Sequence, residues 1–218
     1  MTSLFLKPSL NTASSASYGM AYSWIPGATA IGAIYDNGIL LAADRRVSYG
    51  TFIMSKNAKK VYKITDKVAI VSAGLISDIQ TLVRTAKYDA NMYKLQTNRD
   101  MTARAMAKLL SNALFSMRLT PLLTQTIVGG FDFDKKSVYV LDAMGSIIED
   151  KYAALGSGAT VALGVLESSF KDGLNYDALK GLVLNAIRAA LERDTASGNG
   201  LDLLNIDQRG TTEEFVAF

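Results

Sequence analysis

Two residue types that the chain lacks limit the chemistry it can perform. Its 218 residues include no cysteine and no histidine. Disulfides, cysteine nucleophiles, Cys/His zinc sites and Ser-His-Asp triads are therefore excluded. A general base in this protein must be a carboxylate, a lysine, a tyrosine or the α-amino group of the chain itself.

Two charged motifs supply groups of that kind. Asp44-Arg45-Arg46 follows one apolar run, and Lys59-Lys60 precedes another. Asp44 and Lys60 could form a reactive pair, or an ordinary solvated ion pair at two strand ends. On a strand Arg45 and Arg46 point to opposite sides, so Arg45 is expected to be a surface charge.

A glycine-rich motif, Gly156-Ser157-Gly158, precedes an expected helix and could hold a phosphate. A dinucleotide-binding fingerprint would need a third glycine where Val161 stands, and no P-loop lysine follows. A nucleotide-binding α/β protein is thus an alternative class. It would be stabilised against heat by ATP or NAD, and we expect no such stabilisation.

Short strands bounded by turn residues must position these groups. A strand at 29–35, the turn Asp36-Asn37-Gly38 and a return strand at 39–44 form a hairpin. A second hairpin pairs 61–64 with 67–73. Further strands are expected at 125–132, 136–142, 145–149, 201–206 and 213–217.

Three apolar stripes repeat with the period of a helix. They comprise Ile79, Leu82, Val83, Ala86 and Ala90; Met106, Leu109, Leu110, Ala113, Leu114 and Met117; and Leu179, Leu182, Val183, Ala186, Ile187 and Ala190. A shorter helix is expected at 159–170. Helix pairs placed between hairpins favour an α+β fold with two antiparallel sheets between helix layers.

The composition is that of a globular protein, with 49% hydrophobic and 20% charged residues. The net charge of +3 and the lack of long Lys/Arg runs argue against nucleic acid as a partner. No apolar stretch is long enough to predict a membrane span. Lys7 is the only charge up to Gly27 and no long apolar core follows it, so a secretory signal is not predicted and the cytoplasm is the expected location.

Residues 1–27 differ from the rest, being rich in Ser, Thr, Ala and Tyr and ending at Pro26-Gly27. We interpret them as an appended leader, with a disordered tail as the alternative.

Several ordered motifs resemble those of proteasome β subunits. They are GATAIG at 27–32, GILLAADRR at 38–46, KKV at 59–61, SAG at 72–74, GSG at 156–158, GVLE at 164–167 and ERDTASG at 192–198. They run from about residue 27 to 207 in the family's order and spacing, and any one alone would be unspecific. Ala28-Thr29-Ala30 and Ser48-Tyr49-Gly50 look most like archaeal members.

The resemblance implies an N-terminal-nucleophile hydrolase fold, the four-layer αββα sandwich, formed by residues 28–218 behind a propeptide at 1–27. It implies assembly of the 20S core with α subunits and other β subunits in stacked seven-membered rings. A regulatory ATPase would act through the α ring, and unfolded proteins would be the substrates. No cofactor, metal, nucleic acid or membrane is implied.

The resemblance also implies a site. In active subunits, cleavage of the propeptide frees a threonine whose hydroxyl attacks peptides while its own amine acts as base. Lys60, Asp44 and the supporting Arg46 match the family's charged groups, and the Gly74 N–H matches the oxyanion donor, a type of group worth about 3–4 kcal/mol. The polar groups that support the amine are matched by Ser157, Asp194 and Ser197. The backbone edge along which a substrate strand would bind is matched by Ser48 and Gly74. The pocket for the substrate residue before the cut is matched by Val47, Ala58, Ser72 and Ile76.

One position departs from the family. Ala28 stands where the threonine belongs, so no hydroxyl is available to cleave the Gly27–Ala28 bond or a substrate. Thr29 is not expected to substitute, because adjacent strand residues face opposite sides and its hydroxyl would point away from Lys60. Two explanations stay open: a naturally silent subunit, which we favour, or a threonine replaced deliberately to trap the precursor of an active endopeptidase.

Overall fold

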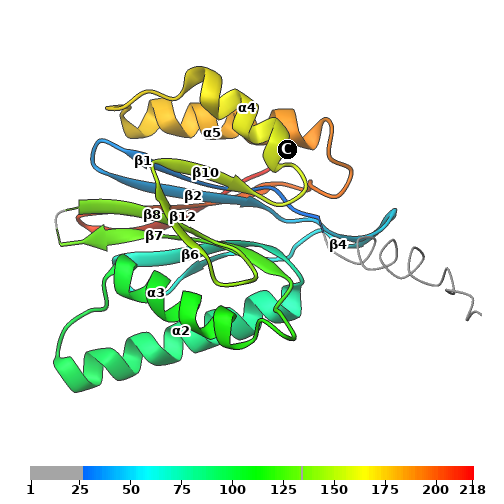
Figure 1. Ribbon diagram of the computed structural model, residues 1–218. Coiled ribbons are helices and arrows are strands. Elements are labelled where there is room, and N and C mark those ends of the chain that lie inside the picture. The colour runs from blue at the N-terminus through cyan, green and yellow to red at the C-terminus, as the bar shows by residue number, and fades with distance from the viewer. Residues whose placement is uncertain (1–26, 134) are drawn as a thin grey trace, which may run out of the picture.

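The computed structural model describes residues 27–133 and 135–218, which form four stacked layers (Figure 1). Helices α4 (Ala159–Ser169) and α5 (Tyr176–Leu191) cover the outer face of one sheet. Helices α2 (Ile76–Thr97) and α3 (Ala103–Ser116) cover the outer face of the other. The predicted leader at 1–27 lies outside the described residues except for Gly27.

The first sheet has the order β10-β1-β2-β11-β12, and its neighbours are antiparallel. Its strands are β1 (Ala30–Tyr35), β2 (Gly38–Asp44), β10 (Tyr152–Leu155), β11 (Leu201–Asp207) and β12 (Gly210–Val216). Strand β12 is an edge strand with an exposed middle, where Glu213 and Glu214 pair with Lys59 and Lys180.

The second sheet has the order β5-β6-β7-β8-β9 and is also antiparallel. Its strands are β5 (Val61–Lys63), β6 (Val68–Gly74), β7 (Thr124–Asp132), β8 (Lys135–Leu141) and β9 (Ile147–Asp150). A separate hairpin, β3 (Val47–Tyr49) with β4 (Phe52–Ser55), extends from one end of the sandwich (Figure 1).

Alternation along the strands divides the core into layers. Ala30 and Leu41 of the first sheet meet Val71 and Ile127 of the second in a cluster between the sheets. The intervening residues face outward: Ile31 and Leu40 pack under α4 and α5, and Ile70 and Val128 pack against α2 and α3. Both faces of each central sheet are therefore buried.

The α+β prediction of two antiparallel sheets between helix pairs is confirmed. The α2 stripe matches the buried residues of that helix. Met117 was placed on the α3 stripe, but this was wrong: α3 ends at Ser116 and Met117 is 40% exposed. Strands β3, β4 and β10 were not predicted.

Candidate active site

Asp44, at the end of β2, joins three segments of the chain through one buried carboxylate. Its Oδ1 accepts hydrogen bonds from the Thr29 amide at 2.9 Å and from Lys60 Nζ at 2.8 Å. Its Oδ2 accepts from the amides of Arg46 and Gly198 at 3.0 and 2.9 Å. With four donors and no exposure, the charge of Asp44 is compensated inside the fold.

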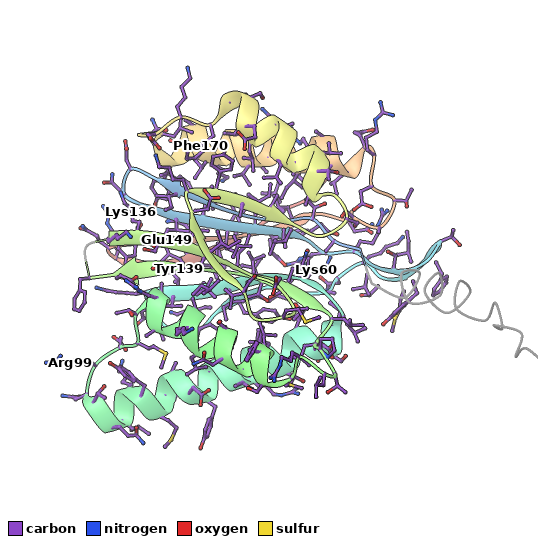
Figure 2. All side chains as sticks on the ribbon, viewed as in Figure 1. Lys60, Arg99, Lys136, Tyr139, Glu149 and Phe170 are labelled. Carbon is purple, nitrogen blue, oxygen red and sulfur yellow. The ribbon has the colours of Figure 1, made fainter. Side chains whose placement is uncertain are left out.

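Lys60 is fully buried, just before β5, and lies between the two sheets (Figure 2). Besides Asp44, its Nζ donates to the backbone carbonyl of Arg46 at 2.6 Å. Burial lowers the pKa of Lys60, because a charged amine is poorly solvated there, while Asp44 opposes that change. Since an ammonium group has three hydrogens, one remains available to a neighbour beyond these two acceptors.

Arg46 connects this pair to the loop after α5. Its Nε donates to the Asn199 side chain at 2.9 Å and its NH1 to the Thr195 carbonyl at 2.9 Å. A Cβ on Gly198 would lie 2.3 Å from the guanidinium, so glycine is needed where the loop crosses Arg46. Arg46 thus holds the 194–199 loop beside Asp44.

Ala28 contacts the second polar group of the predicted site. Its amide donates to Ser157 Oγ at 3.2 Å, and Ser157 Oγ donates to Asp194 Oδ2 at 2.6 Å. Ser197 Oγ donates to the same Asp194 oxygen at 2.6 Å. The structure therefore brings Ala28, Ser157, Asp194 and Ser197 together.

The charged pair and Ala28 lie at the same end of the sandwich. Thr29, which follows Ala28, donates its amide to the Asp44 oxygen that also binds Lys60. Ala28 also packs in the cluster between the sheets with Val61 and Ala73, the neighbours of Lys60 and Gly74. The residues predicted around position 28 thus converge from the segments just before β1 and β5 and from the ends of β2 and β6.

Gly74 ends β6 with φ +136°, and a Cβ there would lie 2.2 Å from the Leu123 carbonyl oxygen. Gly156 has φ +89°, and its Cβ would lie 2.2 Å from the Ala28 oxygen and 3.0 Å from the Ala73 Cβ. Only glycine allows the backbone to approach so closely at these two positions.

The predicted substrate-binding residues differ from one another in burial and in their place in the fold. Val47 and Ser48 are buried in β3, where Ser48 Oγ donates to the Ala196 carbonyl at 3.3 Å. Ala58 and Ile76 are half-buried. Ser72 is fully buried, and its hydroxyl pairs with Thr126 Oγ1 at 3.0 Å in the face of the sheet that α2 and α3 cover.

Arg45 was expected to be a surface charge, and the structure gives it defined partners instead. Its Nε donates to Asp202 Oδ1 at 2.9 Å, and its guanidinium stacks 3.9 Å from the centre of the Phe215 ring. Arg45 therefore links β2 to β11 and β12. No sequence motif indicated this, since Asp202 and Phe215 lie far along the chain.

In the described part of the chain no cluster of acidic residues could hold a metal ion. Within the same residues, no helix is long and apolar enough to cross a membrane.

Comparison with known proteins agrees with the fold. A family model described as proteasome subunit matches residues 26–206. Proteasome subunit beta 2 of Pyrobaculum arsenaticum is 46% identical over 190 residues, covering 87% of this chain and 94% of the relative. Proteasome subunit beta 1 of Staphylothermus marinus is 44% identical, covering 87% and 89%, and that of Desulfurococcus amylolyticus is 42% identical, covering 89% and 96%.

The chain belongs to the proteasome subunit family. Within that family it is a β subunit of the 20S core particle, of the archaeal type. Membership implies assembly with other proteasome subunits.

Proposed function

We propose that this chain is a β subunit that builds the proteolytic chamber but is itself catalytically silent and keeps its leader. The observation that carries the proposal is Ala28, a residue without a side-chain oxygen beside the Asp44–Lys60 pair and the Ser157–Asp194 pair. The partners proposed are α subunits and other β subunits in stacked seven-membered rings, in the cytoplasm, acting on unfolded proteins.

The residues around position 28 suit a threonine nucleophile physically. The freed α-amine of residue 28 is the proposed base, and the positive charge of the neighbouring Lys60 amine favours loss of the hydroxyl proton. Asp44 and Arg46 fix the Lys60 amine at 2.8 and 2.6 Å. Gly74 is proposed to offer its N–H to the carbonyl oxygen under attack, and Ser157 with Asp194 to hold the nitrogen of residue 28.

The test is the Ala28→Thr variant assembled with α-type subunits and assayed on peptide substrates. We expect no hydrolysis by the unaltered chain. The variant should hydrolyse peptides, and mass spectrometry should show that its Gly27–residue 28 bond is cleaved. Ala28→Val is the matched control, because valine has the shape of threonine without the hydroxyl.

Hydrolysis by assemblies of the unaltered chain would contradict catalytic silence. An inert Ala28→Thr assembly would contradict the proposed site.

The second candidate is an active threonine endopeptidase subunit trapped as a precursor by a Thr-to-Ala replacement at position 28. It is favoured by the complete set of supporting groups, from Lys60 and Asp44 to Ser157 and Asp194. Mass spectrometry of the subunit from its native assembly separates the two, since it reports residue 28 and the leader together.

A further inference from the structure

The Thr29 hydroxyl forms a buried hydrogen bond with Ser197, and the proposed function gives this bond no role. Thr29 Oγ1 lies 2.8 Å from Ser197 Oγ, and both residues are buried, at 0% and 1% exposure. A Cβ on Gly158 would lie only 2.0 Å from Thr29 Oγ1, so the backbone there closely approaches the hydroxyl. Thr29 is therefore fixed on the side of β1 that faces α4 and α5, opposite to Ala28.

The direction of this hydrogen bond follows from counting protons. A serine hydroxyl has one hydrogen, and Ser197 donates its hydrogen to Asp194 Oδ2 at 2.6 Å. Ser197 must then accept from Thr29, which is the donor. Ser157 likewise donates to Asp194 Oδ2 and accepts from the Ala28 amide.

Asp194 Oδ2 is thus the end of two parallel chains of hydrogen bonds. One chain starts at the nitrogen of residue 28 and passes through Ser157, and the other starts at the Thr29 hydroxyl and passes through Ser197. Because both end on one oxygen, the position of Ser197 limits where Asp194 can lie relative to the residue 28 nitrogen.

We propose that Thr29 is a positioning residue: through Ser197 it holds Asp194 in register with the nitrogen of residue 28. This inference rests on the proposed function, in which that nitrogen becomes the base after cleavage. Thr29 does not touch the reacting atoms, so its effect is expected on turnover and not on substrate binding.

The experiment compares Thr29→Val and Thr29→Ser, each combined with Ala28→Thr in the assembled particle. Valine keeps the shape but leaves the buried Ser197 oxygen without its donor, whereas serine keeps the donor. We expect Thr29→Val to lower kcat about tenfold, the effect of roughly one lost hydrogen bond, with KM unchanged within about twofold. Thr29→Ser should restore kcat.

Thr126→Val is the matched control, because Thr126 and Ser72 form a second buried hydroxyl pair, at 3.0 Å, in the other sheet. It should lower the thermal midpoint like Thr29→Val while leaving kcat unchanged. Full kcat in Thr29→Val, or an equal loss in Thr126→Val, would overturn the proposal.

A second measurement stands apart from catalysis. This measurement uses the chain that keeps Ala28 and carries Thr29→Val as its single substitution. A cryo-EM structure of its assembly should show that Asp194 has moved away from Ser157, whereas Thr29→Ser should keep their 2.6 Å contact. An intact contact in Thr29→Val would overturn the proposal. If Ala28→Thr is inert while this displacement occurs, the proposed function fails and the positioning role of Thr29 remains.

Discussion

At the scale of single residues, Asp44 and Lys60 matter for folding as well as for any reaction. Lys60 and Asp44 are 1% and 0% exposed. Replacing Lys60 by methionine leaves a buried carboxylate without its counter-ion. We expect Lys60→Met to lower the free energy of unfolding by about 3 kcal/mol, because removing one partner of a buried pair is strongly destabilising. This loss does not depend on catalysis, so it is expected in the chain with Ala28.

Urea denaturation of the isolated subunit measures that change. Lys59→Met is the control next in sequence: Lys59 pairs with Glu213, but its side chain is 45% exposed, so the loss should stay below about 1 kcal/mol. Equal losses in the two variants would contradict a special role for the buried pair.

The pH dependence of stability gives a second residue-scale prediction. Burial lowers the pKa of Lys60 in the folded chain below its ordinary value of 10.5. Between the lowered value and 10.5 the unfolded chain binds more protons, so the contribution of Lys60 to stability rises with pH. The difference in unfolding free energy between the unaltered chain and Lys60→Met should therefore widen as pH is raised toward 10.5.

That slope cannot exceed about 1.4 kcal/mol per pH unit for one group. Urea titrations of both chains at a series of alkaline pH values provide the measurement. A difference that narrows with rising pH would show that the pKa of Lys60 is not lowered by burial.

Residue-scale prediction from sequence succeeded only in part. Strand alternation correctly turned the Thr29 side chain away from the Ala28 side, but alternation did not predict that its hydroxyl binds Ser197. Arg45 has a partner, Asp202, far away in sequence. Short-range patterns carry no information about such contacts, and the roles around Lys60 came from family resemblance.

At the scale of elements, two helical glycines offer a way to stabilise the fold. Gly164 in α4 and Gly181 in α5 have open space where a Cβ would lie. Glycine lowers helix stability relative to alanine by about 0.5–1 kcal/mol. We expect Gly164→Ala and Gly181→Ala each to raise the thermal midpoint of the isolated subunit, measured by circular dichroism.

Gly158→Ala is the contrasting variant, because its Cβ would clash with the Thr29 hydroxyl at the start of α4. It should lower the midpoint. If Gly164→Ala instead destabilised the isolated subunit, the helix would need flexibility at that position.

Element prediction worked where periodicity is strong and failed where elements are short. The α2 stripe from Ile79 to Ala90 was predicted because five apolar residues recur at helical spacing. Strand β10 was missed because Tyr-Ala-Ala-Leu has no alternation. Strand β4 was missed because it is exposed on both faces.

At the scale of the whole molecule, the β3–β4 hairpin exposes apolar side chains beyond the sandwich. Phe52 and Met54 are 70% and 62% exposed. Exposed apolar groups in a chain that assembles often mark contacts with other subunits. We expect the double variant Phe52→Ser and Met54→Ser to fold normally but to assemble less well with α-type subunits, as measured by size-exclusion chromatography.

Phe133→Ser is the control, since Phe133 is 86% exposed in the β7–β8 turn, away from the hairpin. An equal loss of assembly in this variant would attribute the effect to reduced surface apolarity in general. A lower thermal midpoint in the double variant would show that the hairpin supports the fold itself.

The layered architecture was predictable because the helical stripes and hairpin turns each need a buried partner surface. The relative order of the strands was not, since β11 inserts beside β2 although the two are far apart in sequence. Neither the residue pattern nor the resemblance to the proteasome family, which indicated only the four layers, predicted that long-range pairing.

Strand β12 has one free side, where unpaired backbone groups could recruit a strand from another molecule. Glu213 and Glu214 lie in the middle of β12, and their ion pairs with Lys59 and Lys180 hold the two carboxylates in place. These charges disfavour pairing of β12 with the same edge strand of a second copy of the chain. Such protection would keep free copies from forming fibrous aggregates before their ring partners arrive.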